Sequence, residues 1–437
     1  MKKMIRTLFT VGLAVVSNFP LSALAVPSFS RQTGIDCQGC HTQHMAILND
    51  FGQSFKASGY RTMGTQARIE SENLSIPESL NASMLLKGRY QRSNGSDASG
   101  TIPGTSTNGG QWQFPDEFSL YFGGRIASNI GFFFEGNTTA PALVSAFKLP
   151  ATIEINDYHL SATPFMTTSF GSSYSYEQAS TGAVRNIVWA EHRKEISAQQ
   201  YLGTDGAATG IALIAINNNG YINFSRWAPA FTASSGSAQM FRSTYLRVAA
   251  TPRIDSPTLG EMSIHAGGQL WAGENYAQDS LNVLTPVSTR AMALDAQLFS
   301  SYDGHDFALF TTWAKSPGGS VSRPNILNVG ALKNTHDVAQ YRLNERSAFT
   351  IGGDYSVLPN ILHVGGAFRA AKTGGNTGAL AVIGTNHSDN AITLTAVYSL
   401  AQNIELQANH SYYFGTLYDV AQPTGKLLST IMLQAAW

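Results

Sequence analysis

The residues with the most distinctive chemistry in this chain are Cys37-Gln38-Gly39-Cys40-His41. Two thiols at this spacing can add to the two vinyl groups of one haem, and the adjacent imidazole can then bind the iron as an axial ligand. The chain has only two cysteines, and both lie in this motif. The spacing therefore predicts one covalent haem c held by Cys37 and Cys40, with His41 bound to the iron.

Four other interpretations fit the cysteine pair less well. A disulfide would close a very short loop and would add little stability. A redox-active dithiol requires a thioredoxin-like strand and helix around it, which this sequence lacks. A zinc site would need further thiols or a second suitably spaced pair. A chance match is rare in an exported chain that has no other cysteine.

The residue on the other side of the iron is less clearly marked. His44 and Met45 follow His41 so closely that, on one helix, they would project from the same side of the haem. Met63 lies beyond Gly59-Tyr60, where the chain could fold back over the far side. We expect Met63 as the distal ligand and His44 as the alternative, with another residue or water also open. Met45 and Met63 could instead be apolar packing.

The first residues predict export. A basic start is followed by a short apolar run at residues 8–16 and by Ala23-Leu24-Ala25, a pattern after which signal peptidase cuts. The apolar run is too short to span a bilayer, so a retained anchor is the weaker alternative. We therefore predict a signal peptide at residues 1–25, and export agrees with haem c, which is attached outside the cytoplasm.

The composition indicates the fold class. Only 13% of residues are charged, 11% are aromatic, and the formal net charge is zero. The charged share is about half of that in an ordinary globular chain. The zero net charge argues against a nucleic-acid partner, and no stretch after residue 25 approaches the roughly 20 apolar residues of a membrane helix. These features suit a sheet that faces lipid on one side and water on the other.

The pattern along the chain separates a short segment from a long one. Residues 26–75 contain the haem motif and a helix-like stretch from about Thr42 to Ser58, and are predicted to be an α-helical monohaem cytochrome c segment. From about Leu80 the period is two. In the last nine residues Ile431, Leu433 and Trp437 share one face, as an outer-membrane barrel requires of its closing strand. Residues 76–437 are therefore predicted to form an all-β transmembrane barrel in the outer membrane of a Gram-negative bacterium.

Sixteen antiparallel strands are expected, because short and long connections alternate along the chain. Thr163-Pro164 and a somewhat longer segment at 251–260 are among the predicted short connections. The strands are predicted at 81–92, 113–126, 130–138, 151–162, 165–176, 207–217, 220–228, 240–250, 261–272, 290–302, 306–315, 346–357, 361–371, 389–400, 404–415 and 426–437.

One long loop, residues 177–206, contains a helix-like segment at 184–196 with the densest charge cluster in the chain. It either folds into the lumen and narrows it or lies outside as a solvated helix. The histidines outside the haem segment show no metal-ligand spacing, and we assign them to the lumen or the loops; they are His159, His265, His305, His336, His363, His387 and His410. No other catalytic motif stands out.

The segment around the haem motif resembles a known family. Ser28-Phe29-Ser30-Arg31-Gln32-Thr33-Gly34-Ile35 leads into the motif, and Leu48-Asn49-Asp50-Phe51-Gly52 continues through Phe55-Lys56 to Gly59-Tyr60. Both blocks resemble the fused outer-membrane monohaem cytochrome–porins of iron-oxidising bacteria. The match covers Pro27 to Tyr60, and Ser30 stands where the family usually has Ala. Beyond Tyr60 the resemblance is architectural.

The resemblance implies an electron-transfer function. The haem would take electrons from an extracellular donor, chiefly Fe(II), and pass them through the barrel to a periplasmic cytochrome or other carrier. The haem segment would plug the lumen, since about 50 residues bury too little apolar surface to fold well alone. Two alternatives are a diffusion porin with a haem-containing plug and a conduit for another extracellular redox partner. The sequence shows no carboxylate cluster that marks an iron-binding site.

Overall fold

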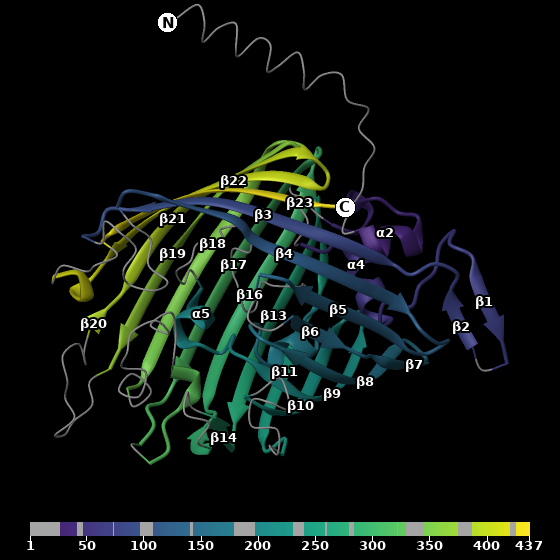
Figure 1. The fold of residues 1–437 in the computed structure, drawn as a ribbon, viewed down its shortest axis with the longest axis horizontal. Helices are drawn as coiled ribbons and strands as arrows, with labels where there is room; N and C mark the ends of the chain where they lie inside the picture. The colour runs from purple at the N-terminus through teal and green to yellow at the C-terminus, as the bar shows by residue number, and fades with distance from the viewer. Residues whose placement is uncertain are drawn as a thin grey trace, which may run out of the picture.

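A computed structural model describes residues 27–41, 47–72, 74–96, 108–139, 143–178, 197–229, 240–257, 260–278, 284–320, 322–328, 344–374, 387–419 and 425–437. The predicted signal peptide, His44, Met45, His336 and the helix-like segment 184–196 lie outside these residues. Figure 1 shows a closed cylinder of strands with a group of short helices at one end.

The cylinder is an antiparallel barrel in which the last strand pairs with the first, Leu428 opposite Ser93 and Ala436 opposite Leu85. Three strands are interrupted, because two consecutive segments pair with the same neighbouring strand. These segments are 144–148 and 151–155 beside 158–167, 243–250 and 253–256 beside 260–272, and 387–388 and 390–401 beside 362–373. The nineteen described segments therefore form sixteen strands, which confirms the predicted number.

The barrel segments are β3 (Ala82–Ser93), β4 (Gln111–Arg125), β5 (Gly131–Asn137), β6 (Val144–Lys148), β7 (Ala151–Ile155), β8 (Tyr158–Thr167), β9 (Ala208–Asn217), β10 (Gly220–Ala228), β11 (Ser243–Ala250), β12 (Arg253–Ser256), β13 (Gly260–Ala272), β16 (Ala291–Tyr302), β17 (His305–Ser316), β18 (Arg346–Leu358), β19 (Leu362–Thr373), β20 (His387–Ser388), β21 (Asn390–Ala401), β22 (Ile404–Phe414) and β23 (Leu427–Ala436). A hairpin of β14 (Glu274–Gln278) and β15 (Leu284–Ser288) extends one long loop. Two 3₁₀ turns, η3 (Ile326–Asn328) and η5 (Thr416–Asp419), lie in loops between barrel strands.

Alternation along the strands gives the barrel an apolar outside. In β23, Ile431 and Leu433 are exposed on the outer face, whereas Thr430 and Met432 are buried on the inner face, as the period of two predicted. Large exposed aliphatic side chains recur on the other strands, among them Ile211, Leu213, Ile222, Leu294, Leu309, Ile351 and Leu394. A closed sheet with an apolar outer surface satisfies its backbone internally and suits lipid. The chain is located in an outer membrane.

Two predicted strand positions are wrong. The strands expected at 151–162 and 165–176 are found at 144–155, interrupted between β6 and β7, and at 158–167, and they turn at Asn156-Asp157. Pro164 therefore lies inside β8. Its missing N–H costs no ladder bond, because it lies beside the interruption at Leu149-Pro150, where the Leu149 N–H donates to the Pro164 carbonyl at 3.0 Å.

The connection predicted at 251–260 is also shorter than expected. Residues 253–256 form β12, which pairs with the start of β13 from Arg253 opposite Ser263 to Ser256 opposite Gly260. The sequence reads as a loop because Pro252 interrupts the strand, and β11 resumes as β12 beyond it.

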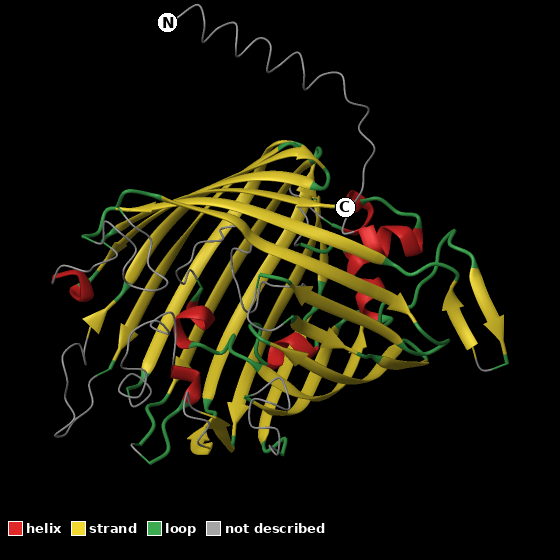
Figure 2. Ribbon diagram, in the orientation of Figure 1, coloured by secondary structure: helices red, strands yellow, loops and turns green. Residues whose placement is uncertain are grey.

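The loop between β8 and β9, residues 168–207, is called the inner loop here. Its described parts include η1 (Ser172–Ser175) and α5 (Ala198–Leu202), and both contact inward-facing wall residues. Ser175 Oγ accepts from Asn223 Nδ2 at 2.8 Å, and Tyr201 Oη lies 2.8 Å from Thr373 Oγ1. Figure 2 shows these helices within the strand cylinder. The described ends of this loop fold into the lumen, whereas the helix-like segment 184–196, to which the two interpretations applied, lies outside the described residues.

The residues before the barrel form α2 (Pro27–Thr33), α3 (Cys37–Cys40) and α4 (Asp50–Ala57), followed by a hairpin of β1 (Arg68–Ser71) and β2 (Leu74–Pro77). They lie at the end of the barrel that carries the short turns (Figure 1), which is the periplasmic end in outer-membrane barrels. Residues 27–64 are called the N-terminal segment below. No described helix is long and apolar enough to cross a membrane.

Candidate functional site

The cysteine motif forms a single helical turn, α3. Asp36 begins it, with Oδ1 accepting from the Gly39 N–H at 3.0 Å, and the His41 N–H closes it on the Cys37 carbonyl at 2.8 Å. A Cβ on Gly39 would lie 2.1 Å from Ile35 Cγ2, so a larger residue there would force the Ile35 side chain to move. Neither cysteine is in a disulfide. Both thiols are thus held one turn apart, in the reduced form that thioether formation needs.

The barrel contributes to the surroundings of these thiols. Cys37 is buried, and its Sγ donates to the Gln402 carbonyl at 3.4 Å, in the turn between β21 and β22. Burial raises the pKa of Cys37 to about 12 and that of Cys40 to about 11. The nearby charge of Asp36 adds to the effect on both thiols, and that of Glu405 adds to the effect on Cys37. Both side chains are therefore protonated thiols at neutral pH.

His41 is oriented as a metal-binding histidine should be. Its Nδ1 lies 3.2 Å from the Ile47 carbonyl, so an Nδ1–H donated there leaves Nε2 for a metal. Burial lowers the pKa of His41 to about 4, which keeps the imidazole in its neutral, ligating form. Ile47 packs against Phe299, Ala308 and Phe310 of the barrel wall. The barrel wall therefore holds Ile47 in place, and the Ile47 carbonyl orients the ring of His41.

Helix α4 supports the motif from the other side. The Asn49 N–H donates to the Cys40 carbonyl at 3.0 Å, and Asn49 Nδ2 donates to the Gln38 carbonyl at 3.1 Å. A Cβ on Gly52 would lie 2.3 Å from the Cys40 carbonyl oxygen, so only glycine permits this approach. Asn49 and Gly52 belong to the second block of the family resemblance, and these contacts give that block a physical role.

Gln32 joins the N-terminal segment to the barrel. It is fully buried, and its Nε2 donates to the carbonyls of Tyr60 at 2.7 Å and Thr62 at 2.8 Å. Its Oε1 accepts from Asn81 Nδ2 at 3.2 Å and from the Arg125 N–H at 3.1 Å. The sequence marked Gln32 only as part of the family signature and did not indicate this anchoring role.

An aromatic cluster extends the same attachment. The ring of Phe29 lies 5.0 Å from that of Phe55, 5.2 Å from that of Tyr60 and 6.0 Å from that of Phe133 on β5. Such pairs contribute about 0.5–1.5 kcal/mol each beyond their buried area.

The two predicted distal ligands have different outcomes. His44 lies outside the described residues. Met63 is half-buried, and its neighbours are fixed to α2 and to the start of β3: the Gly64 N–H donates to the Gln32 carbonyl at 3.1 Å, and Gln66 Nε2 donates to Asn81 Oδ1 at 2.8 Å. None of the hydrogen bonds that fix residues 61–66 in the described chain reaches Cys37 or His41. Within the described residues, no group of three or more His, Cys, Asp or Glu side chains could hold a metal ion. Met63 as distal ligand stays a prediction.

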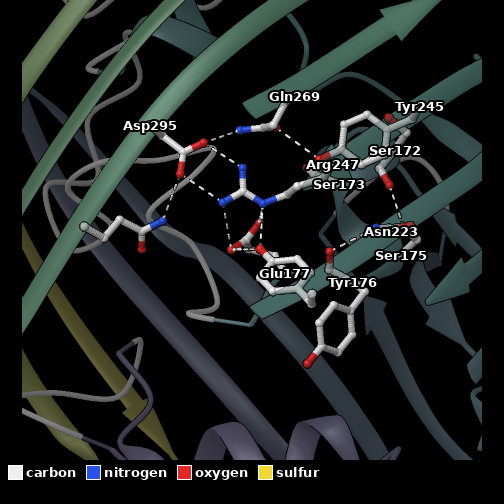
Figure 3. Close-up of polar contacts among 12 residues, drawn as sticks. Ser172, Ser173, Ser175, Tyr176, Glu177, Asn223, Tyr245, Arg247, Gln269 and Asp295 are labelled. Atoms are coloured by element: carbon white, nitrogen blue, oxygen red, sulfur yellow. Dashed lines mark hydrogen bonds and ion pairs between the residues drawn. The ribbon is translucent and has the colours of Figure 1, made fainter. Parts of the chain in front are cut away.

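A second polar centre lies in the lumen, around Arg247 on β11 (Figure 3). Its guanidinium donates to Asp295 through Nη1 at 2.6 Å and Nη2 at 2.9 Å, and its Nε lies 2.7 Å from Glu177 Oε2. Tyr221 Oη donates to Glu177 Oε1 at 2.7 Å. The wall thereby holds the inner loop through buried charges. The sequence did not indicate this cluster, because its members come from β10, β11, β16 and a loop.

The inner loop also contacts the N-terminal segment. Lys56 Nζ on α4 donates to the Glu177 carbonyl, while the Glu177 carboxylate binds Arg247. Burial lowers the pKa of Lys56 to about 8 and raises that of Glu177, the latter effect being opposed by the charge of Arg247. A continuous chain of contacts thus runs from the haem-motif segment through the inner loop to the wall.

Comparisons with known proteins support the barrel. OmpF of Salmonella typhi, solved in complex with daunomycin, is similar with a TM-score of 0.50 and 11% identity over 85% of this chain and 100% of that one. OmpT of Vibrio cholerae and the outer-membrane channel DcaP of Acinetobacter baumannii each give a TM-score of 0.47 over 85% of this chain and 100% of theirs, at 10% and 11% identity. The chain is an outer-membrane, porin-like β-barrel. No protein-family model and no curated protein matches it.

Proposed function

We propose that this barrel conducts electrons across the outer membrane through a haem c bound by Cys37, Cys40 and His41. The observation that carries the proposal is the position of the motif against the barrel. Cys37 contacts the β21–β22 turn, and the carbonyl that orients His41 belongs to Ile47, which packs on β16 and β17. These contacts seat the motif in the periplasmic mouth of the barrel, so an extracellular donor would reach the haem through the lumen.

The chain's own residues have separate tasks in this proposal. When bound, the haem supplies a centre that is reversibly oxidised and reduced by one electron. Cys37 and Cys40 attach it, and His41 provides a neutral ligand whose ring is held by Ile47. Gln32 keeps the segment in the barrel mouth. Cys37 is buried and His41 is half-buried, which limits access of water to the centre.

The electron donor and acceptor follow from the family resemblance of residues 27–60. We propose extracellular Fe(II) as the donor substrate and a periplasmic cytochrome or other carrier as the acceptor. This direction agrees with the placement of the motif at the short-turn, periplasmic end, where a carrier can approach it.

The proposal is tested with the full-length protein in sealed vesicles under anaerobic conditions. Fe(II) added outside should reduce the haem, seen as its alpha band, and should then reduce oxidised cytochrome c enclosed in the vesicle. The double variant Cys37→Ala/Cys40→Ala should form the same barrel and transfer no electrons. A wild-type haem that stays oxidised in the presence of Fe(II) would reject iron as donor, as would a haem potential well below that of the iron couple. Reduction by another extracellular reductant would then favour a conduit for that partner.

A diffusion porin with a haem-containing plug is the second candidate, and the barrel fold shared with OmpF supports it more directly than it supports electron transfer. The specific observation in its favour is the lumen, where the buried Arg247 clamp holds the inner loop as a constriction would require. Rapid uptake of a neutral sugar into vesicles by the full-length protein, together with a haem that no extracellular reductant reduces, would favour this candidate.

A further inference from the structure

We infer that the barrel wall supplies the second axial ligand of the haem iron, and that this ligand is His363. The inference rests on the proposed haem at Cys37, Cys40 and His41. It assigns a functional residue to a strand that is more than 300 residues away from the motif in the chain, and it joins the N-terminal segment to the wall through the cofactor.

The position of His363 carries the inference. Its side chain is fully buried on the inner face of β19, two residues after the short turn that precedes the strand. Val397 on β21 is its partner, and Gln407 on β22 is the partner of Val397. Gln402, whose carbonyl accepts from Cys37 Sγ, lies in the turn between these same two strands. His363 is thus two strand spacings, roughly 10 Å, from the strand that begins beside Cys37.

The wall around His363 has buried polar atoms that the described structure leaves without a hydrogen-bond partner. They are Ser356 Oγ, Thr395 Oγ1, Gln402 Oε1, Gln407 Oε1 and both amide atoms of Asn409. All belong to β18, β21, β22 or the β21–β22 turn, which lie on either side of β19. Buried side-chain polar atoms normally have a partner, so these atoms can take a polar ligand or water on the lumen side of the wall. The carboxylate side chains of a haem could accept from the hydroxyls of Ser356 and Thr395 and from Asn409 Nδ2, whereas the amide oxygens of Gln402 and Gln407 are themselves acceptors.

The surroundings of His363 also suit a metal ligand. The charge of Asp306, on β17, acts on the imidazole. A carboxylate near a ligating histidine commonly receives the N–H of the ring and fixes its orientation. The neighbouring cluster of Ile47, Phe299, Ala308 and Phe310 supplies the apolar surroundings that a porphyrin ring requires.

His265, the other fully buried histidine of the barrel strands, is placed less well. Its strand, β13, is separated from β21 by β16, β17, β18 and β19. Its Nε2 lies 3.2 Å from Ser263 Oγ, and its ring packs edge-on against Phe299, with the centroids 5.8 Å apart. His265 therefore provides a matched control for His363.

Ligation by His363 would affect both the reduction potential of the haem and the attachment of the N-terminal segment to the barrel. A histidine ligand lowers the reduction potential of a haem relative to methionine, so assignment to His363 in place of Met63 predicts a lower potential for the protein. Iron bonded to His41 on one side and to His363 on the other would also fasten the N-terminal segment to the barrel.

The test uses purified full-length protein with its haem attached, and it reads ligation by visible, near-infrared magnetic circular dichroism and electron paramagnetic resonance spectra. The wild-type protein should show low-spin iron with two histidine ligands. His363→Ala should convert the iron to a high-spin form, and added imidazole should restore the low-spin form. His363→Met should give low-spin iron with a methionine charge-transfer band and a higher potential. His265→Ala and Met63→Leu should leave the spectra unchanged.

Two results would overturn the assignment: a histidine–methionine spectrum in the wild type, or an unchanged low-spin spectrum in His363→Ala. A histidine–histidine spectrum in the wild type would also be expected if His44 were the ligand, so His44→Ala, which should leave the spectra unchanged, separates the two assignments. The heat-dependent mobility of the barrel on gels reports whether each variant folds. A wild-type protein without covalent haem would instead reject the proposed function, so the two failures are distinguishable.

Discussion

The barrel wall and the N-terminal segment are held together in different ways. In the wall each strand repeats one backbone ladder, as from Arg346 opposite Thr373 down to Leu358 opposite Leu362 in the β18–β19 pair. The described part of the N-terminal segment has three short helices. Individual residues fix them: Gln32 bonds to the wall, Asn49 bonds to the cysteine motif, and Gly52 allows close approach by the absence of a side chain.

This difference teaches where the molecule is sensitive to mutation. The closed ladder distributes the stability of the wall over many equivalent bonds, so most single changes there should have small effects. In the N-terminal segment each contact is made once. The wall therefore depends on its few buried charges and on its lipid face, whereas the segment depends on single polar anchors.

The largest effect is expected where the wall departs from its repetitive plan. Arg247→Met would leave Glu177 and Asp295 as unpaired buried charges, and loss of one partner from a buried pair costs about 3–5 kcal/mol. We expect a lower midpoint of denaturant unfolding in detergent, together with higher ion conductance as the inner loop leaves the wall. Arg226→Met is the matched control, since that arginine is exposed on β10. Equal effects of the two substitutions would show that the Arg247 clamp does not hold the loop.

An intermediate effect is expected on the lipid face. Leu394 is exposed in the middle of β21 and Leu358 is exposed at the periplasmic end of β18. Arginine in the middle of the bilayer costs about 2–4 kcal/mol, and close to zero to 1 near the interface. Leu394→Arg should therefore destabilise the barrel in lipid much more than Leu358→Arg, as measured by unfolding from vesicles. Equal costs would contradict the placement of these strands in the membrane.

The smallest effect on stability is expected in the N-terminal segment, where it should be local. Gln32→Leu removes the partners of buried backbone groups and should cost about 1–3 kcal/mol. Hydrogen exchange in residues 27–64 should become roughly five- to 150-fold faster by that figure, since each 1.4 kcal/mol is tenfold, while exchange in the barrel stays the same. Ser30→Ala, on the same helix, should change neither. Faster exchange throughout the barrel would show that the two regions are not independent.

The repetitive region was also the easier one to predict from the sequence. Strand number, the faces of β23 and most strand positions follow from a period of two. The turn expected at Thr163-Pro164 was wrong because proline marks a turn locally, and only the pairing shows that Pro164 lies beside the interruption at Leu149-Pro150. The ladder, which forms between distant residues, outweighed the local signal.

The site was predictable only in its local part. The spacing of Cys37, Cys40 and His41 is a chemical pattern that a sequence displays directly. The acceptor of the Cys37 thiol at Gln402 and the wall residues behind Ile47 come from the far end of the chain, and no spacing rule connects them to the motif. His363 was set aside among the scattered histidines for the same reason: only the strand pairing shows that β19 lies two strands from β22, which begins after the turn that contacts Cys37.

The central claim is that an outer-membrane barrel of this sequence carries one covalent haem in its N-terminal segment. The most direct measurement is the intact mass of the mature protein purified from outer membranes, combined with a haem stain after denaturing electrophoresis. We predict a mass equal to that of the mature chain plus one haem, and a positive stain. In Cys37→Ala/Cys40→Ala the added haem mass and the stain should both disappear while the barrel stays folded. A folded wild-type barrel with the mass of the polypeptide alone and no stain would contradict the account.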